Sequence, residues 1–155
     1  FLPWFTWRKG ECGLRAIEVA KNELALHNYS CVIVYEDRVL MTSFDSGVKP
    51  LIQYYETQSE NFRNAVLADK VIGRAAAFLV VLCGITSVYA EVMSIEAKKI
   101  LEEYNIYYEY NCLVPFIANR NRDDRCPMEE LSEGVEQPIE MYNRIKHWLA
   151  GISSK

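Results

Sequence analysis

The feature that most constrains the fold is a stretch of small and charged residues that leads into an apolar run. Residues 68–77 read Ala-Asp-Lys-Val-Ile-Gly-Arg-Ala-Ala-Ala, and residues 78–82 read Phe-Leu-Val-Val-Leu. Alanine-rich and apolar sequence of this length favours a helix buried in a core. We therefore expect a central helix that begins at Asp69 and ends at Gly84, with Asp69 as a ligand contact or only as the N-cap.

Length, charge and cysteine content exclude several classes of protein. The 155 residues suit a single domain, 1–155, in which residues 1–28 form an N-terminal arm and helix. A net charge of −4 argues against general nucleic-acid binding and against attraction to acidic membranes. The longest apolar run, 75–83, is much shorter than the roughly 20 residues of a membrane span. Five scattered cysteines suit a reducing compartment, so we expect a cytoplasmic protein.

The remaining periodicity predicts an α/β protein. Helical spacing or capping residues indicate helices at 11–28, 51–56, 94–104 (capped by Ser94), from Pro127 onward, and 138–150. Short apolar runs indicate strands at 31–35, 38–43, 85–90 and 106–113. A hairpin followed by helix-linked strands predicts a three-layer α/β/α sandwich on a mixed sheet.

Four ordered segments carry a resemblance to a known family. They are residues 46–51 (Ser-Gly-Val-Lys-Pro-Leu), 68–77, 88–90 with Ser94, and 117–120 followed by 126–129. On these motifs the chain resembles, from about residue 30 to residue 150, a family of uncharacterised prokaryotic proteins with a cytidine-deaminase-like fold. The resemblance implies that fold and a pocket. The family has no agreed activity, so no reaction is implied.

Zinc-dependent deamination is not expected, because the ligands are missing. That chemistry uses His/Cys-x-Glu at the start of the central helix and Pro-Cys-x-x-Cys at the start of the next. This chain has Gly73-Arg74-Ala75 and Ser94-Ile-Glu-Ala at those places, and its histidines, His27 and His147, fall on peripheral helices. We expect no metal site, and no cofactor is indicated.

An anion is the ligand that the first turn of the expected central helix suggests. Lys70 and Arg74, four residues apart, would hold a phosphate or carboxylate above free backbone amides. Gly73 would let a ligand ring approach closely, or would serve tight helix packing instead. A similar Asp-Lys-x-Ile-Gly segment occurs in formate dehydrogenase accessory sulfurtransferases, which resemble deaminases in fold and bind a pterin nucleotide. The expected partner is therefore a small anionic or nucleotide-like molecule.

Loop residues supply the other candidate ligand contacts. Ser46 and Gly47 would form a binding loop, or an ordinary turn. Asn119 and Arg120 follow a strand, where ligands of α/β proteins often bind, although Arg120 also suits a surface ion pair. The hydroxyl of Ser94 would face the pocket, or would only cap its helix. The acidic residues Glu129, Glu130 and Glu133 are interpreted as a solvated helix face.

Cys126 is the candidate catalytic residue. It precedes Pro127 at a helix start, where the helix dipole and the nearby Arg122 and Arg125 favour a thiolate. Such a thiol would serve as a nucleophile or a redox group, or Cys126 would be a structural cap. No histidine is placed as an obvious base.

Three function classes follow from these residues. The first is a sensor or accessory factor that binds a small anionic or nucleotide-like ligand without much chemistry. The second is an enzyme that uses Cys126, and the third is an assembly or interaction partner. A homodimer is expected, because the aromatic residues Phe1, Trp4, Phe5 and Trp7 need cover.

Overall fold

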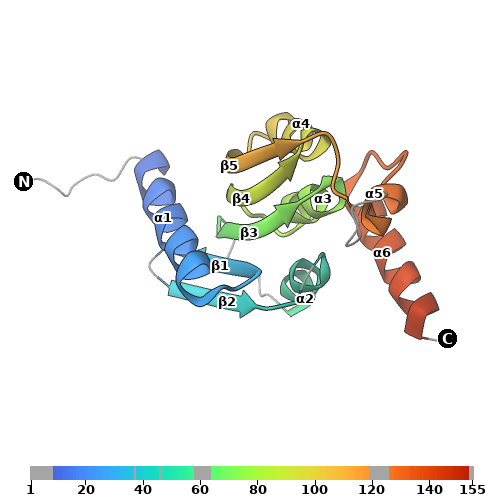
Figure 1. Cartoon of the computed structure of the whole chain (residues 1–155), viewed down its shortest axis with the longest axis horizontal. Coiled ribbons are helices and arrows are strands. Elements are labelled where there is room, and N and C mark those ends of the chain that lie inside the picture. Colours follow the sequence, from blue (N-terminus) through green and yellow to red (C-terminus); the bar gives the residue numbers. More distant parts are fainter. Residues whose placement is uncertain (1–8, 37, 46, 58–63, 119–125, 154–155) are drawn as a thin grey trace, which may run out of the picture.

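A mixed five-stranded sheet forms the centre of the molecule (Figure 1). The computed structural model describes residues 9–36, 38–45, 47–57, 64–118 and 126–153. The strands are β1 (Cys31–Tyr35), β2 (Arg38–Ser43), β3 (Val66–Ile72), β4 (Ser87–Ser94) and β5 (Tyr107–Val114), in the order β2-β1-β3-β4-β5. β1 runs antiparallel to β2 and β3, whereas β3, β4 and β5 are mutually parallel.

Helices cover both faces of the sheet. They are α1 (Lys9–His27), α2 (Lys49–Thr57), α3 (Arg74–Leu82), α4 (Ile95–Glu103), α5 (Pro127–Leu131) and α6 (Pro138–Ser153). Apolar residues of α1, such as Ile17 and Leu24, pack on Val32, Val66 and Ala68 on one face. The larger core lies on the other face, under α2, α3 and α4 (Figure 1). The predicted α/β class, with three layers on a mixed sheet, is confirmed.

The prediction of a central helix is wrong for residues 69–72, which belong to a strand. Residues 66–72 form β3, which pairs with β1 on one side and β4 on the other. Asp69 and Lys70 therefore lie on a strand, and the helix begins only at Arg74, after Gly73 in an extended conformation (φ −101°). Backbone pairing on both sides outweighs the helical preference of a short alanine-containing segment. Asp69 is thus no helix cap, and Lys70 and Arg74 share no helix face.

The ends of the other elements follow local chemistry closely. The Ala97 N–H donates to Ser94 Oγ at 3.0 Å, so Ser94 is the N-cap of α4 as predicted. Gly84 ends α3 with φ +74°, and Pro127 begins α5. The strand expected at 85–90 begins and ends later, at Ser87 and Ser94. No helix in the described part of the chain is long and apolar enough to cross a membrane.

Candidate functional site

A cavity of about 640 Å³ lies where β3 ends. Its walls come from the loop before α2, the junction of β3 and α3, the segment after β5, and helices α5 and α6. Most of the lining is apolar and includes Val48, Val71, Ile117, Met128 and Trp148. The charged and thiol side chains on it are Asp45, Lys49, Cys126 and Glu129.

Glu129 occupies the N-terminus of α3. The Arg74 N–H donates to Glu129 Oε1 at 3.2 Å, and the Ile117 N–H donates to Oε2, also at 3.2 Å. Only 7% of Glu129 is exposed. The interpretation of Glu129 as part of a solvated helix face is therefore wrong. The anion expected at the start of this helix is supplied by the protein itself.

Gly73 is required by the close approach of Glu129. A Cβ atom at this position would lie 2.8 Å from Glu129 Oε1 and 2.9 Å from Ile117 Cγ1. Both distances are shorter than real Cβ contacts, so any side chain would displace the carboxylate. The groups that come close to Gly73 are therefore the side chains of Glu129 and Ile117, and not a ligand ring.

Arg74 points away from the cavity and joins α3 to the connection between α5 and α6. Its Nε donates to the Ser132 carbonyl at 3.1 Å, and its Nη2 donates to the Val135 carbonyl. Its Nη1 forms an ion pair with Glu96 at 3.3 Å, and the guanidinium lies over the Phe78 ring. These contacts use the guanidinium N–H groups of Arg74, which were expected to hold a ligand anion.

Asp69 is a buried acid inside the sheet. It is 6% exposed and lies opposite Cys31 on the neighbouring strand. Burial raises the pKa of Asp69 to about 8, although backbone N–H groups of Val71 and Lys70 donate to the carboxylate and partly offset the shift. Burial also raises the pKa of the Cys31 thiol well above its ordinary value. Neither side chain lines the cavity.

Lys70 and Ser94 also lie away from the cavity lining. The Lys70 ammonium donates to Asn28 Oδ1 at 2.7 Å, at the end of α1. Ser94 is fully buried, and its hydroxyl accepts from Ala97. Ser46, Asn119 and Arg120 fall outside the described residues.

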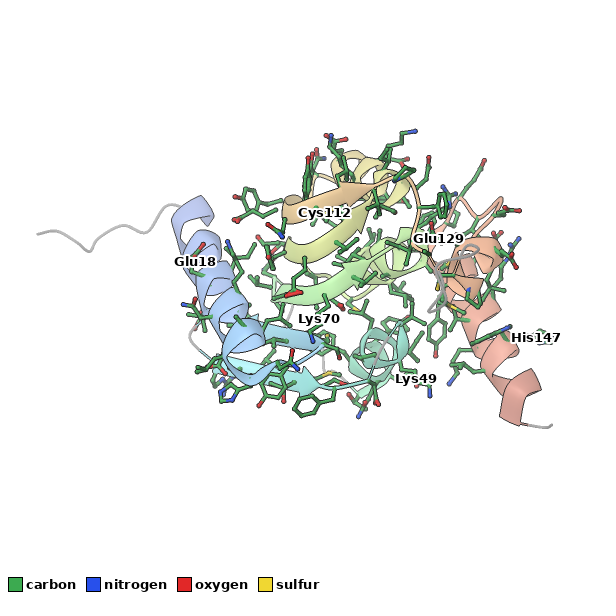
Figure 2. The ribbon with its side chains drawn as sticks, viewed as in Figure 1. Glu18, Lys49, Lys70, Cys112, Glu129 and His147 are labelled. Carbon is green, nitrogen blue, oxygen red and sulfur yellow. The ribbon has the colours of Figure 1, made fainter. Side chains whose placement is uncertain are left out.

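Gly47, Gly73 and Cys126 are the predicted site residues that the structure brings to the cavity wall. The Cys126 backbone N–H donates to the Ile117 carbonyl at 2.8 Å, and its half-buried side chain makes no capping bond. Neither histidine lines the cavity; His147 lies on the outer side of α6 (Figure 2). Within the described ranges, no three His, Cys, Asp or Glu side chains gather to hold a metal ion.

Comparison with known proteins decides the family. The family described as a domain of unknown function, DUF1893, matches residues 19–149. The chain belongs to this family. The predicted membership of an uncharacterised family is therefore confirmed.

A solved structure from the same family shows the fold of this DUF1893 member. The crystal structure of the DUF1893 family protein TM1506 from Thermotoga maritima matches with a TM-score of 0.79 and 24% sequence identity, over 92% of each chain. A diaminohydroxyphosphoribosylaminopyrimidine deaminase/5-amino-6-(5-phosphoribosylamino)uracil reductase from the same organism matches with a TM-score of 0.43 and 17% identity. That match covers 64% of this chain and 35% of the other. None of the curated proteins matches this chain.

Proposed function

We propose that this DUF1893 member binds a small nucleotide-like ligand with one anionic group, and acts as a sensor or accessory factor. The cavity carries the proposal. Its volume of about 640 Å³ falls in the range typical of small-molecule sites, and its mostly apolar wall with a few polar groups is the usual composition of such sites.

Lys49 is the residue that would hold the anionic group. It begins α2, lines the cavity and is exposed, so it lies at the rim. It forms no ion pair with any residue in the described ranges. Asp45 is also exposed on the rim, which leaves little net charge there. A phosphate or carboxylate would therefore gain from direct contact with Lys49 rather than from long-range attraction.

Lys49→Ala is expected to weaken nucleotide binding about tenfold, the loss typical of one partly solvated charge contact. The measurement is isothermal titration with GMP, AMP, CMP and UMP, with inorganic phosphate as a fifth probe. Lys99→Ala is the matched control, because Lys99 is exposed on α4 and lies off the cavity.

A thermal-shift screen of the unmodified protein tests the proposal as a whole. A nucleotide at 100 times its dissociation constant stabilises the fold by about 2.7 kcal/mol. The proposal is wrong if nucleotides, pterins and organic acids all leave the melting temperature unchanged. Ala76→Met, which adds volume to the cavity wall, is expected to abolish any shift that arises in this cavity.

Chemistry at Cys126 is a second candidate function, favoured by the position of this half-buried cysteine in the cavity wall. The absence of both histidines from the wall argues for binding over catalysis. We expect Cys126→Ser to keep nucleotide affinity within about threefold, since no hydrogen bond of the α5 cap depends on the thiol.

Alkylation by iodoacetamide supplies an independent measurement on the unmodified protein. Bound nucleotide is expected to slow the labelling of Cys126 and to leave the exposed Cys112 unaffected. If the unmodified protein instead turns over a bound ligand and the Cys126→Ser variant does not, the enzymatic function is supported.

A further inference from the structure

Glu129 gives the inner end of the cavity a chemistry opposite to that of the rim. Its side chain comes from α5 and contacts the first turn of α3, whereas Lys49 belongs to α2, and the two residues lie apart in Figure 2. The cavity thus has an exposed cation at one place and a buried carboxylate at another.

The Glu129 carboxylate keeps acceptor capacity that the described residues do not use. A carboxylate offers about four acceptor positions, two on each oxygen. One N–H group donates to each oxygen of Glu129, and no other donor in the described ranges reaches it. Unused acceptor capacity on a buried group is unfavourable unless water or a ligand supplies the missing donors.

The same carboxylate disfavours an anion at this end of the cavity. Arg74, whose guanidinium would otherwise neutralise it, instead contacts the Ser132 and Val135 carbonyls and Glu96. A ligand phosphate beside Glu129 would face a like charge in a place shielded from water. N–H groups are the complementary partner.

Small and apolar residues line the cavity wall that Glu129 shares, which suits a flat ring. Ala75 and Ala76 contribute only methyl groups to the lining, whereas the position above Gly73 is already taken by Glu129 and Ile117. Ile117 and Met128 add apolar surface on the same wall. An aromatic ring that enters along this surface brings its edge toward the carboxylate.

We infer that Glu129 is a specificity-determining residue, which recognises a heteroaromatic ring through an amino group adjacent to a ring N–H. Two parallel N–H donors match the two oxygens of a carboxylate. This inference rests on the proposed function and adds the orientation of the ligand: the amino edge is at Glu129 and the anionic group is at Lys49. Guanine and pterin rings carry such an edge.

Titration with GMP, IMP and AMP tests the inference without any mutation. IMP lacks the amino group of GMP, and AMP has an amino group without an adjacent ring N–H. The unmodified protein is expected to bind GMP at least about tenfold more tightly than either, because each lost donor leaves Glu129 less satisfied.

The Glu129→Gln variant tests whether that preference comes from this residue. Glutamine keeps one oxygen acceptor and introduces an N–H donor, so the preference for GMP is expected to fall to within about threefold. Glu130→Gln on the exposed neighbouring position is the matched control and should keep the full preference. Lys49→Ala should weaken all three nucleotides by a similar factor and leave the preference unchanged.

The outcomes separate the two proposals. Equal affinities for the three nucleotides, all reduced by Lys49→Ala, would overturn the role of Glu129 and leave the proposed function standing. No binding of any of the three would overturn the inference, and the proposed function would fall with it only if the thermal-shift screen were also negative. The comparison of GMP, IMP and AMP uses the unmodified protein. It can therefore refute the inference even if the Glu129 variant fails to fold.

Discussion

The Asp69→Asn variant is expected to be more stable than the unmodified protein, by an amount that grows with pH. Burial holds the pKa of Asp69 at about 8, against an ordinary value of 3.8. The folded state therefore binds this proton more tightly than the unfolded state, so the contribution of Asp69 to stability is full below about pH 4 and is lost as pH rises to about 8. Asparagine has nearly the same shape and no charge, which makes the gain at pH 8 on the order of a few kcal/mol.

Urea denaturation at several pH values between 5 and 8.5 measures this effect. The buried thiols Cys31 and Cys83, whose pKa values burial also raises, are present in both proteins, so their effect on stability largely cancels in the comparison. Asp45→Asn, which removes an exposed acid, is the control and should leave the pH profile unchanged. Equal gains for Asp69→Asn at pH 5 and at pH 8.5 would contradict the raised pKa.

Arg74→Ala is expected to destabilise the fold by about 3 kcal/mol, because it removes charge-assisted hydrogen bonds and leaves buried carbonyls without a donor. The carbonyls of Ser132 and Val135 belong to fully buried residues, and Glu96 loses its partner. The connection between α5 and α6 loses its link to α3, so amide hydrogen exchange in α5 should accelerate more than exchange in the sheet.

Arg74→Lys and Arg144→Ala are the matched variants for this prediction. Lysine keeps the charge but lacks the planar fork, so it should recover less than half of the lost stability. Arg144 also donates to two carbonyls beside α5, those of Leu131 and Glu133, but it is exposed, and its loss should cost under about 1 kcal/mol. A greater loss for Arg144→Ala than for Arg74→Ala would refute the role assigned to Arg74.

Local signals were sufficient for most elements of the fold. Ser94 and Pro127 mark helix starts and Gly84 marks a helix end through backbone chemistry that needs no tertiary context. β3 was missed because a buried central strand reads as a short apolar run, which periodicity alone does not distinguish from a buried helix. Gly73, in extended backbone between Ile72 and the helix, was the available signal for the boundary.

The candidate site depended more on packing between distant segments. Gly47, Gly73 and Cys126 were found because glycine and cysteine at element ends stand out in a sequence. Glu129 was missed because three acids within five residues are typical of a solvated face, and its burial depends on contacts with α3 and with Ile117.

The cavity is completed only after the sheet has been synthesised. All five strands have been made once residue 114 emerges, together with α1 to α4, while α5 and α6 follow. Until then the first amides of α3 lack Glu129, and Ala75 and Ala76 have no opposing wall from Met128 and Trp148. A ligand therefore cannot guide the assembly of the sheet on the ribosome. Its binding would stabilise only chains whose C-terminal helices have already docked.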